Sequence, residues 1–127
     1  LCFNGNAEKA LNYYASVLNA DIKIELRYDR RKKVKEKENR GRVLYGTLNI
    51  GDSMILVSDV PFGDPFYPGN TMMMRIEFNS ASQLQKAFET LAGEGRILMP
   101  LQPMFFSHQC AMVRDKFGVE WLLSVFN

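Results

Sequence analysis

Apolar residues recur at helical spacing in two stretches of the chain. In residues 6–20 they fall on one stripe of a helix, and Asn6 is the expected N-cap. The members of this stripe are Ala10, Leu11, Tyr14, Val17 and Leu18. An amphipathic helix that buries one side is therefore predicted here.

Residues 81–95 repeat this pattern. Ser80 or Ser82 is expected to open the second helix, and Gly93 or Gly95 to end it. Its apolar stripe consists of Leu84, Ala87, Phe88 and Leu91. The chain thus carries two similar helices in similar surroundings.

Each predicted helix follows a short apolar stretch and precedes three strand-like runs. The preceding stretches are residues 1–3 and 71–78. The runs are 21–28, 42–51 and 52–59 after the first helix, and 96–103, 109–115 and 119–126 after the second. The predicted fold is α+β, with a βαβββ module at about 1–60 and another at about 70–127.

The connector at residues 60–70 reads "VPFGDPFYPGN" and is rich in Pro, Gly and aromatic residues. Such a segment cannot continue a central strand, so it is expected to link the two modules. The turns at residues 49–53 and 115–118 lead into strands. A phosphate-binding glycine loop has to open a helix, so neither turn is expected to bind phosphate.

Composition places the chain among globular proteins. Hydrophobic residues make up 46% and charged residues 24%, and no apolar run approaches the ~20 residues of a membrane span. The N-terminal residues do not resemble a signal peptide, so the cytoplasm is the expected location. Cys2 and Cys110 are far apart and lie in no CxxC pattern, which predicts reduced thiols and no zinc site.

Positive charge is concentrated in residues 29–42, where eight Lys or Arg face three acids. This segment is net +5 in a chain of net +2. We expect residues 30–41 to form a mobile, solvated loop, and an acidic partner or substrate is the alternative. The absence of an aromatic residue for base stacking argues against nucleic acid.

Three sequence words in this order resemble the PhnB-like branch of the glyoxalase/bleomycin resistance/dioxygenase superfamily, also called vicinal oxygen chelate. They are "FNGNAEKALNYYASVLNA", "LNIGDSMILVSD" and "MPLQPMFF" followed by "MVRDKFGVEW". The resemblance implies two βαβββ modules that form a curved mixed sheet with a central cleft. It also implies a homodimer, because relatives commonly form one.

In metal-bearing relatives, His and Glu side chains from the first and last strands of each module hold a divalent ion. Here Met72, Met73 and Met74 stand where a histidine is expected. Leu122 occupies the acidic position, with Glu120 two residues earlier. The prediction is therefore a protein with no catalytic metal and no cofactor.

The expected cleft lining is largely apolar with a few polar groups. Its residues are Tyr45, Phe66, Met72, Met74, Phe105, Phe106, His108 and Glu120. Tyr45 stands where many PhnB-like sequences have histidine, and a phenol with an ordinary pKa of ~10 orients a ligand more readily than it abstracts a proton. His108 is placed in a variable turn, where it is either solvated or reaches the cleft mouth, and Trp121 is expected to be a core or interface anchor.

Three functions remain open at this point. The leading hypothesis is a metal-free protein that binds a small apolar or aromatic molecule in its cleft, with no membrane or nucleic-acid partner. One alternative is a glyoxalase-type lyase or dioxygenase whose unusual metal site uses Asp59 and Glu120. The other is a protein-interaction module with a vestigial cleft, in which the basic loop makes the contact. Methyl transfer is disfavoured because no glycine-rich loop for S-adenosylmethionine follows a strand.

Overall fold

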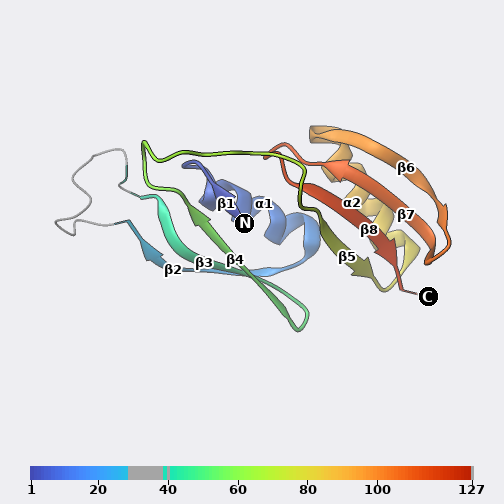
Figure 1. Cartoon of the computed structure of the whole chain (residues 1–127). Coiled ribbons are helices and arrows are strands. Elements are labelled where there is room, and N and C mark those ends of the chain that lie inside the picture. The colour runs from blue at the N-terminus through green and yellow to red at the C-terminus, as the bar shows by residue number, and fades with distance from the viewer. Residues whose placement is uncertain (29–38, 40, 127) are drawn as a thin grey trace. The chain divides into compact units, whose positions relative to one another are not determined.

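A computed structural model describes residues 1–28, 39 and 41–126, and Figure 1 draws the chain. It divides into two compact units, residues 1–67 and 68–127. The first contains β1 (Cys2–Phe3), α1 (Ala7–Leu18), β2 (Asp21–Arg27), β3 (Val43–Ile50) and β4 (Ser53–Asp59). The second contains β5 (Met74–Phe78), α2 (Ala81–Glu94), β6 (Arg96–Met104), β7 (Ser107–Arg114) and β8 (Glu120–Val125).

Both units have the same topology. The strand order is β1-β4-β3-β2 in the first sheet and β5-β8-β7-β6 in the second. The first strand of each unit pairs in parallel with the last, and the other pairs are antiparallel. The predicted α+β fold with two βαβββ modules is therefore confirmed.

In each module the helix packs against one face of that module's own sheet (Figure 1). The buried side of α1 consists of Ala7, Ala10, Leu11, Tyr14 and Leu18. Gly46 on β3 lets this helix approach closely, because a Cβ there would lie 3.2 Å from Leu11 Cδ1. Four residues of the predicted stripe thus belong to the core of the first module, whereas Val17 is only half-buried.

The start of α1 is not capped in the way the sequence predicts. Asn6 occupies the N-cap position, but its side chain makes no capping hydrogen bond. Asp59 on β4 replaces it, since its Oδ1 accepts from the backbone N–H of Gly5 (2.7 Å) and of Ala7 (3.0 Å). Its Oδ2 accepts from Val43 N–H at 2.8 Å. A buried carboxylate satisfies the free N–H groups and suits the positive end of the helix dipole. This explains why Asp59, and not the Asn6 side chain, caps the helix.

In the second module the predicted boundaries of the helix hold. Ser80 is the N-cap and its hydroxyl accepts from Gln83 N–H, while Gly95 is the C-cap. A Cβ on Gly95 would lie 2.1 Å from the carbonyl oxygen of Arg114, so only glycine fits there. The helix covers its sheet with Leu84, Ala87 and Leu91.

Trp121 is fully buried in this module. Its Nε1–H donates to Asp115 Oδ2 at 2.7 Å, and the other oxygen of Asp115 accepts from the N–H groups of Phe117 and Val119. One aspartate therefore closes the β7–β8 turn and satisfies the indole. This agrees with the prediction that Trp121 is a structural anchor.

Two further sequence predictions concern the basic loop and the position of His108. The basic loop predicted at residues 30–41 falls largely on residues 29–38 and 40, which lie outside the described residues. His108 was expected in a turn, but the turn is Phe105–Phe106 and His108 lies on strand β7. That expectation was wrong because strand pairing of β7 begins already at Ser107, opposite Met104.

No helix in residues 1–28, 39 and 41–126 has both the length and the apolar character needed to cross a membrane.

Candidate functional site

The face of the first sheet opposite α1 is apolar for much of its length, and we call it the first open face. On β4, Met54 and Leu56 are 60% and 50% exposed. Side chains alternate along the strand, so Val57, the next residue, is buried on the α1 side. On β3, Leu44 and Tyr45 are both exposed although they are neighbours. The register of the β2–β3 pair shifts at this point, and such an irregularity re-aims side chains.

A concavity of about 360 Å³ is formed on the first module. It is lined by Leu1, Cys2, Leu44, Tyr45, Leu56, Val57 and Ser58. The Tyr45 hydroxyl has no hydrogen-bond partner within the part of the chain that the structure describes. The site therefore combines apolar walls with one phenol that is available to a ligand.

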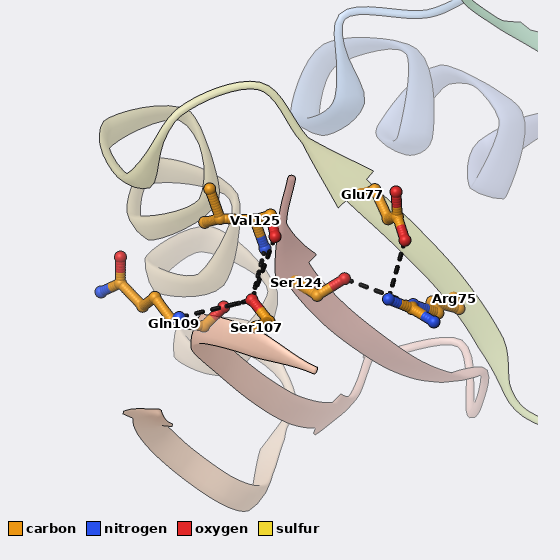
Figure 2. A network of polar contacts seen from close by, with 6 residues as sticks. All are labelled: Arg75, Glu77, Ser107, Gln109, Ser124 and Val125. Carbon is orange, nitrogen blue, oxygen red and sulfur yellow. Dashed lines mark hydrogen bonds and ion pairs between the residues drawn. The ribbon is translucent and has the colours of Figure 1, made fainter. Parts of the chain in front are cut away.

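The face of the second sheet opposite α2, here the second open face, is more polar. Arg75 on β5 forms an ion pair with Glu77 Oε1 at 2.7 Å and donates from Nε to Ser124 Oγ on β8 at 3.3 Å (Figure 2). Its guanidinium carbon lies 5.0 Å from the ring centre of Phe106. Strand pairing sets Cys110 opposite Ser124, so the thiol belongs to the same face.

Cys110 is poorly suited to act as a nucleophile. Burial raises the pKa of its thiol, and the positive charge of Arg75 opposes this only in part. The thiolate is the reactive form, so a raised pKa keeps Cys110 protonated and unreactive near neutral pH.

Ser107 also has a structural role. Its hydroxyl accepts from Val125 N–H at 3.1 Å and lies 3.0 Å from the Val125 carbonyl oxygen and 2.7 Å from that of Gln109 (Figure 2). The side chain is buried and pins the end of β8 to the start of β7. By strand alternation, His108 points to the opposite face, so the two neighbours do not form a nucleophile–base pair.

The sequence matches the family model described as 3-demethylubiquinone-9 3-methyltransferase over residues 1–124. The chain belongs to this family. Relatives include protein YjdN of Escherichia coli (strain K12), which is 27% identical over 136 residues that cover 98% of this chain and 91% of YjdN.

Solved structures agree with the family assignment. The PhnB protein of Bacillus cereus is 30% identical with a TM-score of 0.81, and the match covers 99% of this chain and 95% of that one. Protein PA1353 of Pseudomonas aeruginosa is 24% identical with a TM-score of 0.87, over 98% and 92% of the two chains.

A member of the glyoxalase/bleomycin resistance protein/dioxygenase superfamily from Sphaerobacter thermophilus shares the fold at 15% identity. Its TM-score is 0.64, and the match covers 99% of this chain and 94% of that one. The family model and the PhnB protein of Bacillus cereus thus confirm the PhnB-like resemblance, and the fold is shared with this superfamily member.

The residues proposed for an unusual metal site in this family member fit that role poorly. Both oxygens of Asp59 already accept backbone N–H groups, so the carboxylate belongs to the fold. Glu120 is only 6% exposed; its Oε1 lies 3.5 Å from Arg114 Nη2 and its Oε2 is buried without a partner. No group of three or more His, Cys, Asp or Glu is arranged to hold a metal within residues 1–28, 39 and 41–126.

The predicted site residues fall in both modules. Tyr45 and the half-buried Phe66 belong to the first unit, and the other six belong to the second. In the second unit, Met72 and Phe105 are 82% and 96% exposed, and His108 is exposed as well. The remaining three, Met74, Phe106 and Glu120, are half-buried or buried.

Sequence reasoning missed Leu44 and Leu56 on the first open face and Arg75 and Ser124 on the second. Leu56 could have been found from the alternation of β4, which points it away from Val57. The Arg75–Ser124 contact joins residues 49 positions apart and has no local signal in the sequence.

Proposed function

We propose that this family member binds a small, largely apolar or aromatic molecule on its first open face, with Tyr45 as the polar anchor. The observation that carries this proposal is the concavity of about 360 Å³, whose apolar lining residues include Leu1, Leu44 and Leu56. Ligand pockets of roughly 300–1,000 Å³ are mostly apolar with a few placed polar groups. The residues that line this concavity have the same character.

The polar groups of the concavity favour a ligand with one hydrogen-bonding function. Tyr45 can donate or accept through its hydroxyl, and Ser58 contributes a second hydroxyl, 4.0 Å from the thiol of Cys2. No charged side chain lines the concavity. A neutral ring or chain with a carbonyl or hydroxyl group is therefore the proposed ligand class, and no reaction is assigned.

The test is a thermal-shift screen of small aromatic and dicarbonyl compounds, followed by titration of any hit against variants. Tyr45→Phe should weaken binding by roughly 0.5–1.5 kcal/mol, up to about tenfold in Kd, because one hydrogen bond is lost. Tyr67→Phe makes the same chemical change at an 88% exposed position outside the concavity, and it should have no effect. His108→Ala should also do little, because that side chain lies on the second module.

The proposal is wrong if a hit keeps its affinity in Tyr45→Phe but loses it in His108→Ala. Failure of every compound to bind near Tyr45, judged by amide chemical shifts of β3 and β4, would equally contradict it. Such a result would favour the interaction-module alternative.

We further propose that the protein is a homodimer of the cytoplasm. The exposed side chains of Leu26 and Met54 provide apolar sheet surface for self-association, and the free thiols of Cys2 and Cys110 suit a reducing compartment. Light scattering coupled to size exclusion tests the dimer, with a monomer mass as the contradicting result. Elemental analysis of protein purified without chelators tests the metal-dependent alternative; about one metal per chain would support it.

A further inference from the structure

Arg75 is an exposed cation on the second open face that several contacts restrain. Its side chain is 46% exposed, so its outer edge is accessible from solution. Yet three contacts hold the guanidinium in place. Figure 2 shows the contacts of Nε with Ser124 and of Nη2 with Glu77. The third is with the ring of Phe106, whose centre lies 5.0 Å from the guanidinium carbon. A guanidinium fixed in this way loses little further entropy when it binds a ligand.

The donors that remain free point to a particular kind of ligand. Guanidinium has five N–H groups, and the two hydrogen-bonding contacts engage only Nε and Nη2. Nη1 has no partner among the described residues, which leaves the terminal Nη1/Nη2 edge with unused donors. Two adjacent donors on one planar edge match the two oxygens of a carboxylate.

The surroundings indicate what the carboxylate should be attached to. The guanidinium carbon of Arg75 lies over the Phe106 ring, and Phe105 meets Phe106 edge to face with ring centres 5.1 Å apart. Phe105 is 96% exposed and therefore offers an uncovered ring. A flat apolar body can lie on this ring while its charged end reaches the guanidinium.

We propose that Arg75, with Phe105 and Phe106, forms a binding site for small aromatic monocarboxylates on the second module. This site goes beyond the neutral-ligand site around Tyr45, because it uses different residues on a different sheet. Ser124 and Phe106 act as positioning residues that orient the guanidinium, and Glu77 has two opposite effects. It helps to hold Arg75, but its negative charge also opposes an incoming anion.

The experiment is an NMR titration of the full chain with benzoate, with benzamide as the neutral isostere. Benzoate should bind at least about tenfold more tightly than benzamide, because charge-assisted hydrogen bonds are roughly twice as strong as neutral ones. Arg75→Gln should abolish this preference. Arg96→Gln removes an exposed arginine from β6 of the same sheet and should leave the preference intact.

Glu77→Gln gives the sharper readout. Removing the competing carboxylate should tighten benzoate binding several-fold while leaving benzamide binding unchanged. A purely structural ion pair predicts the reverse pattern, a loss of thermal stability without any change in benzoate affinity. Circular dichroism of each variant establishes that it is folded.

The proposal is overturned if benzoate causes no saturable shift of the Arg75 and Ser124 amides. It is also overturned if Arg96→Gln weakens binding as much as Arg75→Gln, since the interaction would then be nonspecific attraction. Tyr45→Phe should not affect the benzoate titration, so failure here and failure of the proposed function are distinguishable.

Discussion

The two modules share one topology but present different open faces. The first exposes Leu44, Leu56 and Tyr45 around a concavity, without a charged side chain in its lining. The corresponding face of the second carries the Arg75–Glu77 pair on β5 and Ser124 on β8. The side of each sheet beneath its helix, in contrast, is mostly apolar in both modules, with Asp59 and Ser107 as buried polar residues.

This contrast distinguishes the side of each sheet that serves folding from the side that can serve function. Burial under a helix requires apolar side chains, and both modules meet that requirement with Leu and Ala on the helix. The opposite face of each sheet is not packed against that module's helix, so the chemistry of the two faces can differ. Differences between two copies of one fold are therefore the best guide to where function lies.

The largest expected effect concerns the close contact at the end of α2. Gly95→Ala should destabilise the protein by about 3 kcal/mol or more, because the added methyl group would collide with the backbone of Arg114. Gly46→Ala in the first module should cost less, about 1–2 kcal/mol, because two of its three nearest neighbours are side chains at 3.2 Å that can shift. Urea denaturation measures both.

Gly93→Ala is the control for that comparison. It lies in α2 with nothing within 4 Å of the position that an added methyl group would take, so it should be neutral or stabilising by up to about 1 kcal/mol. Equal losses at Gly93 and Gly95 would contradict the collision as the cause, because Gly93 has open space for a methyl group and alanine has the higher helix propensity.

The next effect compares the polar side chains that pin each module. Asp59→Ala should cost about 3 kcal/mol, because three backbone N–H groups lose their acceptor. Ser107→Ala in the second module should cost about 1–2 kcal/mol, since the buried Val125 N–H loses its hydroxyl partner. Thermal or urea unfolding measures both variants.

Asn6→Ala tests which residue caps α1. The Asn6 side chain makes no capping bond, so this substitution should change stability by less than about 0.5 kcal/mol. A loss as large as that of Asp59→Ala would contradict the assignment of the cap to β4.

The smallest effect comes from an exposed ion pair of the first module. Arg27 donates to both oxygens of Glu8, at 3.1 and 2.6 Å, and this hydrogen bonding lowers the pKa of Glu8 from its ordinary value of 4.5. A lowered folded-state pKa means that the stabilisation is present above about pH 4.5 and is lost as the pH falls through the folded value. For a half-exposed pair it should amount to less than about 1 kcal/mol.

Glu8→Gln provides the measurement. The difference in urea midpoint between wild type and Glu8→Gln should be visible at pH 7, shrink towards pH 3, and also shrink in high salt. A difference that does not change with pH would show that packing, and not charge, is responsible.

Local sequence pattern determined the elements of this protein. The apolar stripes of α1 and α2, the alternation of β4 and the cap at Ser80 all follow from the spacing of residues that are close in the chain. The repetition of the same order after residue 70 was sufficient to predict two βαβββ modules. These features depend on neighbours within a few residues, which is the range over which propensity and periodicity act.

Tertiary structure decided which distant residues meet. Asp59 caps a helix that begins 52 positions earlier, and Arg75 is held by Ser124, 49 positions later. The register shift that exposes Leu44 beside Tyr45, and the pairing that starts β7 before His108, also depend on strand partners. Such contacts are set by how strands align in a sheet, and no spacing along a single segment records that alignment.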